Sequence, residues 1–551
     1  MRTLGSNMVY RQSRLICALG KAGLGMAAAV VLHGAGLAQI RTDSSLGQSA
    51  QTLAGPAYVI PQSLGRLAGS NLFHSFQSFN INTGESANFT TTTAGLGNVI
   101  SRVTGGTMSQ INGLIALTAI GAAPNFYFIN PAGVTFGAGA SVDVPGAFHV
   151  STANYLKFPD GRLYADTSGA STFSSADPVA FGFLGDSRAS ILVKDSVLHN
   201  AAGGIMLVAG DLAVDNAALW TAGGDIRLVA SGTGPVEINR SGALPLASGQ
   251  LDIRNGAIVI TQATDQSAGG NIQIAAGDTG LRAGARVVTE TATARSAGSI
   301  TTELASLEID GRSATDATGI ISLAAKYDVG TGGNVAVAAR GAIRVLGGGM
   351  VISDTYGLGT AGNVSIKATS LLLDGSGHNN AARITSRSGS DALGNAGVVA
   401  IDVTDSIVLS NASQISSDSF GAGQAGSINL RAGKDIQVLT DSYVVSDAYA
   451  GGNAGTIDIS AQNLTIDGTG GKLLTQVSSQ ALFDSSGQAG SIHITTPGSL
   501  NLVNGGKIIS DTNSVGHAGD IHVTTGALLL DGRDFDGSTG IFSSASFYGS
   551  G

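Results

Sequence analysis

Cysteine is almost absent from this sequence, which contains one such residue in 551. That residue, Cys17, lies within the first 38 residues, which have the organisation of a cleaved secretion signal. The mature chain would therefore contain no cysteine at all. Disulfides cannot stabilise such a chain, and catalysis by a thiol is excluded.

Charged residues are scarce as well, at 12% of the chain, and acidic residues are in excess. Removal of the first 38 residues takes away four of the 29 basic side chains and no acidic one, which leaves 25 against 38 and a net charge of −13. This balance argues against nucleic acid and anionic membrane surfaces as partners. Beyond the N-terminal segment, no apolar run is long enough to span a bilayer.

The N-terminal segment has the three parts of a secretory signal. Basic residues precede an apolar stretch at 22–37, and Gly36-Leu37-Ala38 offers a small-x-small cleavage site. A membrane anchor is the alternative, but the apolar stretch is too short and too rich in glycine and alanine for one. We therefore expect a signal peptide over residues 1–38. The basic residues are Arg2, Arg11, Arg14 and Lys21.

Glycine, in contrast, is abundant and regularly placed, with 81 residues. A phrase of glycine, any residue, then isoleucine or valine occurs nine times from residue 270 onward, at spacings of 28, 35, 29, 35, 29, 29, 35 and 29 residues. A period in this range indicates stacked structural units. The leading glycines are Gly270, Gly298, Gly333, Gly362, Gly397, Gly426, Gly455, Gly490 and Gly519.

Each repeat contains three short strands in which apolar and polar residues alternate, so that one side chain points inward and the next outward. The longer repeats carry an insertion beyond an Asp-Gly turn at Asp310, Asp374 and Asp467, and the turn at Asp531 predicts another. Stacked coils of this kind give an all-β solenoid with three parallel sheets, and a parallel β-helix of about fifteen to eighteen coils fits best. A disordered glycine-rich linker is the alternative, and the mean hydropathy of +0.24 argues against it.

The last residues, "GIFSSASFYGSG", stop where the next glycine phrase is due. An open end of a β-helix is an unpaired edge that needs a cap, so we expect a chain that is truncated at its C-terminus. The expected organisation is a signal at 1–38, an N-terminal β-helix domain at 39–265 and β-helix repeats of 28–35 residues at 266–551.

Aromatic residues make up only 5% of the chain, yet 12 of the 17 phenylalanines lie between Phe73 and Phe183. Within this region, residues 125–137 read "NFYFINPAGVTFG". Asn130 and Pro131 would end a strand, and Gly133 would permit a positive φ in the turn. The aromatic residues on either side of the turn would fill a wide core.

Several phrases of this region, in this order, are similar to the N-terminal secretion domain of filamentous haemagglutinin-like exoproteins, the two-partner secretion family. They are "NLFHSFQSFNINTGESANF", "ISRVTGG", "INGLI", "FYFINPAGV", "FGAGASVDV" and "FHVSTANYLKF". The resemblance covers about residues 50–185, and the later repeats fit the usual architecture of the family.

The resemblance implies a right-handed parallel β-helix with an N-terminal β cap. It also implies export through a dedicated outer-membrane β-barrel partner with periplasmic recognition domains, followed by folding outside the cell. The Asn-Pro-Asn-Gly-Ile motif of the family maps onto Asn130, Pro131, Ala132, Gly133 and Val134. Ala132 departs from the usual asparagine, which leaves the turn intact but weakens any recognition through that side chain.

Two interpretations of this turn remain open. In the first, Asn130 and Pro131 only shape a tight bend between two core strands, because turn residues usually act through conformation. Alternatively, the turn nucleates folding or is read by the transporter, since exposed loops often carry function.

One position of the third strand repeats a polar side chain from coil to coil, and the carboxylates there are Asp354, Asp418, Asp447 and Asp511. The ordinary interpretation is a solvated column of surface carboxylates. A cation between Asp418 and Asp447 and a catalytic pair at the same place are weaker alternatives. No pattern in the sequence indicates a metal site or a cofactor, and His74 and His149 have no second ligand at suitable spacing.

These observations predict a non-enzymatic, adhesin-like exoprotein at the surface of, or released by, a Gram-negative bacterium. Its unidentified target would be a glycan or protein on a host or neighbouring cell. A β-helical polysaccharide-acting enzyme and the stem of a contact-dependent toxin are the alternatives.

Overall fold

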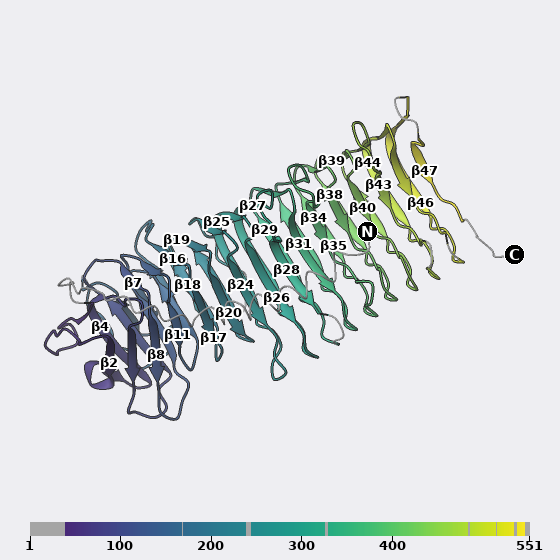
Figure 1. Cartoon of the computed structure of the whole chain (residues 1–551). Coiled ribbons are helices and arrows are strands. Elements are labelled where there is room, and N and C mark those ends of the chain that lie inside the picture. The colour runs from purple at the N-terminus through teal and green to yellow at the C-terminus, as the bar shows by residue number, and fades with distance from the viewer. Residues whose placement is uncertain are drawn as a thin grey trace.

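The computed structural model describes residues 39–167, 169–238, 244–325, 329–482, 485–513, 515–533 and 537–545. These residues form a rod of stacked coils (Figure 1), in which each coil adds one strand to each of three faces. Among the residues so described, the one helical element is a 3₁₀ turn, η1 (Gln62–Leu64). Among the described residues, no helix is long and apolar enough to cross a membrane. The predicted all-β parallel β-helix is therefore confirmed.

The first face is a column of fifteen parallel strands, which lies within the predicted number of coils. Its strands are β4 (Asn71–Phe79), β6 (Asn98–Val103), β9 (Asn125–Ile129), β12 (Phe148–Ser151), β18 (Ile205–Ala209), β21 (Ile226–Ala230), β25 (Ile272–Arg282), β27 (Ile300–Asp310), β29 (Val335–Ala339), β32 (Val364–Ala368), β35 (Val399–Val403), β38 (Ile428–Ala432), β41 (Ile457–Ser460), β44 (Ile492–Val503) and β46 (Ile521–Asp531).

The second face is a shorter parallel column, which the long strands β25, β27, β44 and β46 join to the first. Its other strands are β7 (Ser109–Ile111), β10 (Val134–Phe136), β16 (Ser190–Lys194), β19 (Asp211–Asp215), β23 (Leu251–Arg254), β30 (Ala342–Leu346), β33 (Ser370–Asp374), β36 (Ile407–Ser410), β39 (Asp435–Leu439) and β42 (Asn463–Asp467).

The third face is made by two parallel sheets, one after the other along the rod. The first contains β2 (Ala57–Pro61), β5 (Ser86–Thr90), β8 (Leu114–Thr118) and β11 (Ser141–Asp143). The second contains β17 (Val197–Asn200), β20 (Ala218–Ala222), β24 (Ile258–Gln262), β26 (Arg286–Thr291), β28 (Thr318–Ala324), β31 (Gly349–Thr355), β34 (Arg383–Thr385), β37 (Gln414–Ser416), β40 (Tyr443–Val445), β43 (Thr475–Ser478), β45 (Gly506–Ile509) and β47 (Gly540–Phe542).

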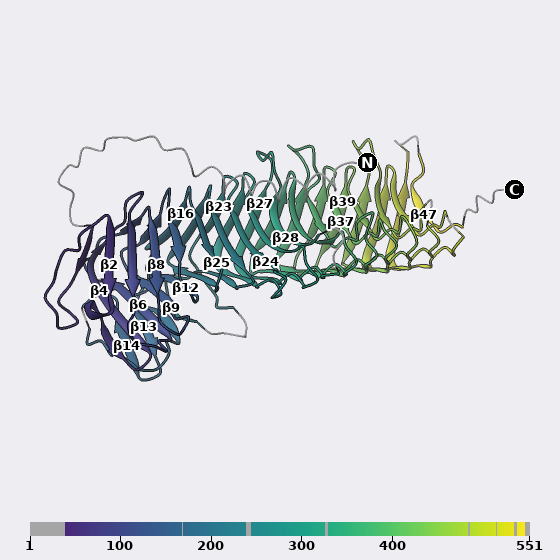
Figure 2. The same ribbon diagram turned by 60° about the horizontal axis from the view of Figure 1, so that its bottom comes forward.

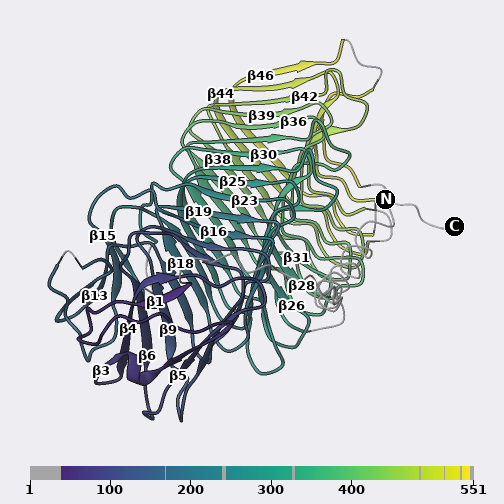
Figure 3. The same cartoon turned by 60° about the vertical axis from the view of Figure 1, so that its left-hand side comes forward.

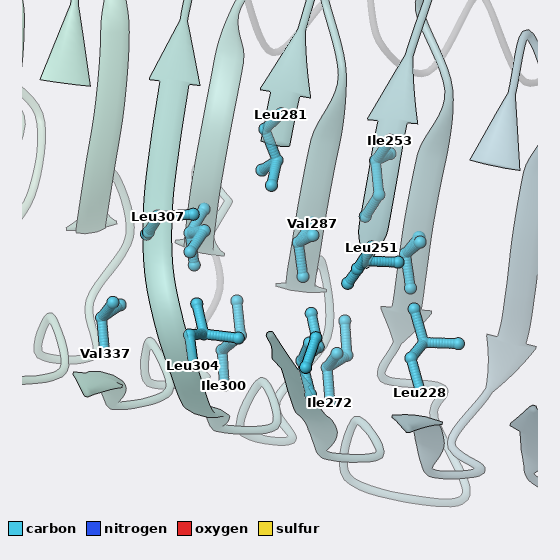
Figure 4. Packing of buried hydrophobic residues seen from close by; sticks show 14 of the residues in the cluster. Leu228, Leu251, Ile253, Ile272, Leu281, Val287, Ile300, Leu304, Leu307 and Val337 are labelled. Atoms are coloured by element: carbon cyan, nitrogen blue, oxygen red, sulfur yellow. The ribbon is translucent and has the colours of Figure 1, made fainter. Parts of the chain in front are cut away.

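The core runs along the axis of the rod, because strand alternation sends every second side chain inward. Figure 4 shows leucine, isoleucine and valine from successive coils in contact there, among them Leu228, Ile272 and Ile300. The insertions also lie where the sequence places them. In the longer repeats the extra residues stand between the second and third faces, for example between β33 and β34, whereas β44 and β45 are joined by a short turn.

The glycine phrases mark a corner where successive coils come closer than a side chain allows. A Cβ on Gly426 would lie 2.0 Å from the carbonyl oxygen of Gly397, the glycine one coil earlier. A buried serine completes this corner: the Ser446 Oγ donates to the Gly426 carbonyl at 2.6 Å and accepts from the Gly455 N–H at 3.0 Å. The glycine repeat is therefore required by backbone contact between coils.

The N-terminal end of the rod is closed. Two short strands, β1 (Ile40–Thr42) and β3 (Arg66–Ala68), pair antiparallel with β4, whose other edge pairs parallel with β6. They cover the edge that the first coil would otherwise leave unpaired, which is the way proteins protect a sheet edge. This is the predicted β cap.

A small antiparallel sheet lies outside the coils near the same end, below β9 and β12 in Figure 2. Its strands are β13 (Tyr155–Phe158), β14 (Gly161–Tyr164), β15 (Ala180–Phe183) and β22 (Gly234–Glu237). It buries a second apolar core against the outward side of the first face, where Leu156 and Phe181 meet Phe73 and Tyr127. This sheet was not predicted. Figure 3 shows it projecting from the coils.

Candidate functional site

The turn at Asn130 joins β9 on the first face to β10 on the second. The Asn130 backbone N–H donates to the Ser151 carbonyl. The Asn130 carbonyl accepts from the Gly133 N–H at 3.0 Å, and this hydrogen bond closes the turn. Val134 then begins β10 between the parallel neighbours β7 and β16. The turn is thus tied to the coil before it and to the coil after it.

The Asn130 side chain is fully buried and uses both ends of its amide. Its Nδ2 donates to the Thr107 carbonyl at 2.9 Å and to the Ser109 Oγ at 3.0 Å, while its Oδ1 accepts from the Ala132 N–H at 3.0 Å. A buried amide that makes three hydrogen bonds fixes local conformation. In the folded chain, this side chain is not offered to a partner.

Gly133 completes the bend with a φ of +114°, a conformation that side chains disfavour. A Cβ there would lie 3.1 Å from the Met108 side chain and 3.2 Å from the Ser190 carbonyl oxygen. Pro131 and Ala132 are half-buried and lie at the surface of the turn. Of the five motif residues, Asn130 and Gly133 set the bend, Pro131 and Ala132 only line it, and the buried Val134 begins β10.

Phenylalanine side chains pack directly beneath the turn. Phe128 lies 5.0 Å from Phe79 and Phe126 lies 4.9 Å from Phe89, measured between ring centroids. Phe136, which follows the turn, meets Phe148 at 6.1 Å. Rings in offset or edge-on contact contribute beyond the apolar area that they bury. The aromatic richness of 125–137 thus builds the wide core of the first coils, as the sequence predicts.

The carboxylates of the third strand form a column, as their spacing predicts. Parallel bridges align Thr355, Ser388, Ser419, Ala448, Ala481 and Thr512, so the residues before them stack one per coil. Those residues are Asp354, Arg387, Asp418, Asp447, Gln480 and Asp511.

The expectation of a solvated column is wrong for three of its four carboxylates. Asp354, Asp418 and Asp447 are only 2%, 1% and 3% exposed, whereas Asp511 is half-buried. Alternation along a strand tells which residues point outward, but it does not tell whether that outward position is covered. The column is therefore part of the structure and not a solvated edge.

Each buried carboxylate has polar partners in the next coil. Asp354 accepts from the Arg387 Nη2 at 3.1 Å, which pairs the two charges. Asp418 accepts from the Asp447 N–H at 3.1 Å, and Asp447 accepts from the Gln480 N–H at 2.8 Å. Burial raises the pKa of Asp418, and burial together with the nearby charge of Asp418 raises the pKa of Asp447.

These raised pKa values predict a rod that is less stable at high pH. A carboxyl whose pKa is higher in the folded state holds its proton more tightly when folded, so its contribution is present at acid pH and is lost as the pH rises from about 4 through neutrality. Asp447→Asn should then stabilise the rod at pH 8 by on the order of 2 kcal/mol and change little at pH 4. Thermal unfolding followed by circular dichroism at several pH values measures this.

Asp511→Asn is the matched control, because the aligned residues on either side of Asp511 are Gln480 and Ser544, which carry no charge. This variant removes a carboxyl of the same column that has no charged neighbour in the adjoining coils, so it measures the effect of the substitution itself. Parallel pH profiles for the parent chain and Asp447→Asn would contradict the burial of a like-charged pair at this column.

The carboxylate column does not line either of two hollows in the surface of the rod. Two surface hollows of about 380 Å³ and about 290 Å³ are lined by other residues. Within the described ranges, no group of three or more histidine, cysteine, aspartate or glutamate side chains is placed to hold a metal ion. Asp418 and Asp447 are at most 3% exposed, so little of either carboxyl is accessible from solvent.

The sequence reasoning missed the serine column at the glycine corner. These serines end the "VIS", "ITS" and "VVS" phrases of the third strand, so the repetition of serine was visible in the sequence. The inward direction of the serine side chains was not. Their role is structural and not catalytic. The members include Ser353, Ser386, Ser417, Ser446, Ser479 and Ser510.

Residues 38–302 match the family model described as the TPS secretion domain. The crystal structure of the HMW1 secretion domain from Haemophilus influenzae is similar at 14% identity over 84% of this chain and 96% of that chain, with a TM-score of 0.35. No curated protein sequence matches the chain significantly.

Proposed function

Because residues 38–302 form a TPS secretion domain and the chain is therefore an exoprotein of the two-partner secretion type, we propose that its N-terminal coils direct export through an outer-membrane β-barrel partner. The family match is the observation that carries this proposal. The partner would bear periplasmic recognition domains, as in the family that the sequence resembles. Residues 1–38, which lie outside the described residues, would act as the signal peptide for the first membrane.

The N-terminal coils would also start folding once the chain emerges. They are closed at one end by β1 and β3 and carry the large aromatic core beneath Asn130. A phenylalanine buries about 150–250 Å², so these coils gain more from burial than the isoleucine-, valine- and leucine-rich coils that follow. Later coils would then add to an edge that is already folded. Folding outside the cell would favour outward movement of the chain without energy from a nucleotide.

We assign the addressing role to residues 39–265 and the role of a stiff, adhesin-like rod to residues 266–551. In a stacked repeat each coil contacts only its neighbours, so the outward side chains vary without loss of the fold. The rod would carry a binding surface for a glycan or protein of a host or neighbouring cell. A polysaccharide-acting enzyme is less well supported, since the buried pair Asp418 and Asp447 adjoins neither surface hollow.

Export from a Gram-negative host tests the addressing role. The whole chain with its N-terminal segment is produced with and without a candidate barrel transporter, and the amounts in periplasm, on the surface and in the medium are measured. We expect surface or medium protein only when the transporter is present. Equal export without it, or retention in the periplasm with every cognate transporter tried, would contradict the proposal.

A further inference from the structure

Two histidines and an aspartate form a second column on the first face, near the C-terminal end of the described rod. Asp458 of β41 pairs in register with His493 of β44, and His493 pairs in register with His522 of β46. The strands are parallel, so aligned side chains lie on the same side about 4.8 Å apart. Their neighbours Ile457 and Ile492 are fully buried in the core, which places the column on the outward side.

The aspartate orients one of the imidazoles. The His493 Nδ1 lies 2.9 Å from the Asp458 Oδ1, and these side chains are 48% and 50% exposed. When Nδ1 carries the proton and donates it to the carboxylate, Nε2 is left with a free lone pair. This carboxylate–histidine arrangement is the one that orients metal-ligating histidines and raises their basicity.

His522 supplies a second imidazole in the next coil, and it is also exposed. Two ring nitrogens on adjacent parallel strands can converge on one ion when the exposed His522 side chain rotates toward His493, whose ring is held by Asp458. A shallow hollow of about 380 Å³ begins at Asp458 and His493 and extends toward the earlier coils, so His522 does not line it. The remaining positions on an ion between the two imidazoles would face solvent, since both histidines are exposed.

We propose that His493 and His522 bind a divalent transition-metal ion, with Zn²⁺ as the probe and Asp458 as a positioning residue. Imidazole nitrogen favours zinc, copper and nickel over calcium and magnesium, which prefer oxygen. Two protein ligands are fewer than a closed structural zinc site contains, so the remaining positions hold water or a ligand from another molecule. The inference does not depend on the route of export.

Calorimetric titration of the purified mature chain with zinc chloride tests the site. We expect one ion per chain, with affinity reduced tenfold or more in His493→Ala and in His522→Ala. Asp458→Asn should weaken binding about 10- to 100-fold while both ligands remain, which a merely structural role would not produce. Calcium chloride should give no binding at these residues.

His517→Ala is the matched control, because His517 is exposed in the same part of the rod but lies outside this column. It should bind zinc as the parent chain does. All the substituted side chains are solvent-exposed, so circular dichroism should be unchanged in every variant. Absence of zinc binding by the parent chain, or binding that survives in both His493→Ala and His522→Ala, would overturn the proposal.

Discussion

The Asn130→Ala variant is expected to lose about 3 kcal/mol of folding stability and most of its export. The substitution removes three hydrogen bonds of a fully buried amide, each worth about 1 kcal/mol. It also leaves the Thr107 carbonyl and the Ala132 N–H without these partners. Denaturant unfolding of the purified chain measures the first effect, and the amount of protein at the cell surface measures the second.

Two neighbouring substitutions separate conformation from recognition at this turn. Pro131→Ala keeps every hydrogen bond of Asn130 and should cost less than about 1 kcal/mol. Ala132→Asn restores the usual residue of the family motif at a half-buried position and should leave stability unchanged. If the turn acts through conformation, export will follow stability across the three variants. Normal folding and export of Asn130→Ala, or loss of export by Pro131→Ala with normal folding, would contradict this account.

The coils of residues 270–531 could be predicted from the sequence because one physical constraint recurs in every repeat. Each glycine phrase marks a backbone contact between coils, and each Asp-Gly turn marks the corner where extra residues leave the stack. A constraint that recurs at a fixed spacing is visible in a single sequence, since the repeats align with one another.

The small sheet beside the first coils could not be predicted in the same way. Phe181 of β15 pairs with Val236 of β22, more than fifty residues later, and no repeat connects them. Phe73 belongs to this second core, whereas Phe76 and Phe79 belong to the central one, so strict alternation fails along β4. Long-range antiparallel pairing of this kind leaves only a weak pattern in the sequence.

The candidate sites could also be predicted only in part. The bend at Asn130 and Gly133 follows from residue types that have few other uses, so its location was predictable. The burial of Asp418 and Asp447 was not predictable, because an outward-pointing residue has the same sequence pattern whether or not other side chains cover it. The partnership of His493 with Asp458 depends on register across 35 residues, which emerges only when the insertions are placed in the coils.

The Gly455→Ala variant is expected to lose about 3 kcal/mol, the upper end of what overpacking produces. A Cβ on Gly455 would lie 2.1 Å from the Gly426 carbonyl oxygen and 2.6 Å from the Ser446 Oγ. The two coils must separate to admit it, which breaks the hydrogen bond from Ser446 to Gly426 and strains the ladder between β38 and β41. Urea unfolding at fixed temperature gives the change in free energy from the shift in midpoint.

Gly451→Ala is a close control, because Gly451 stands four residues earlier in the same loop and its nearest neighbours would lie 3.9 Å from an added Cβ. That substitution should be neutral or stabilise slightly, since alanine restricts the unfolded chain more than glycine does.

In a stack where each coil contacts only its neighbours, the substitution at Gly455 should loosen the coils beyond it and leave the N-terminal coils intact. Limited proteolysis of Gly455→Ala should therefore cut the later coils first and release a stable N-terminal fragment. Equal protease resistance of the two variants would mean that the glycine corner does not couple the coils, and the repeat would then need another explanation.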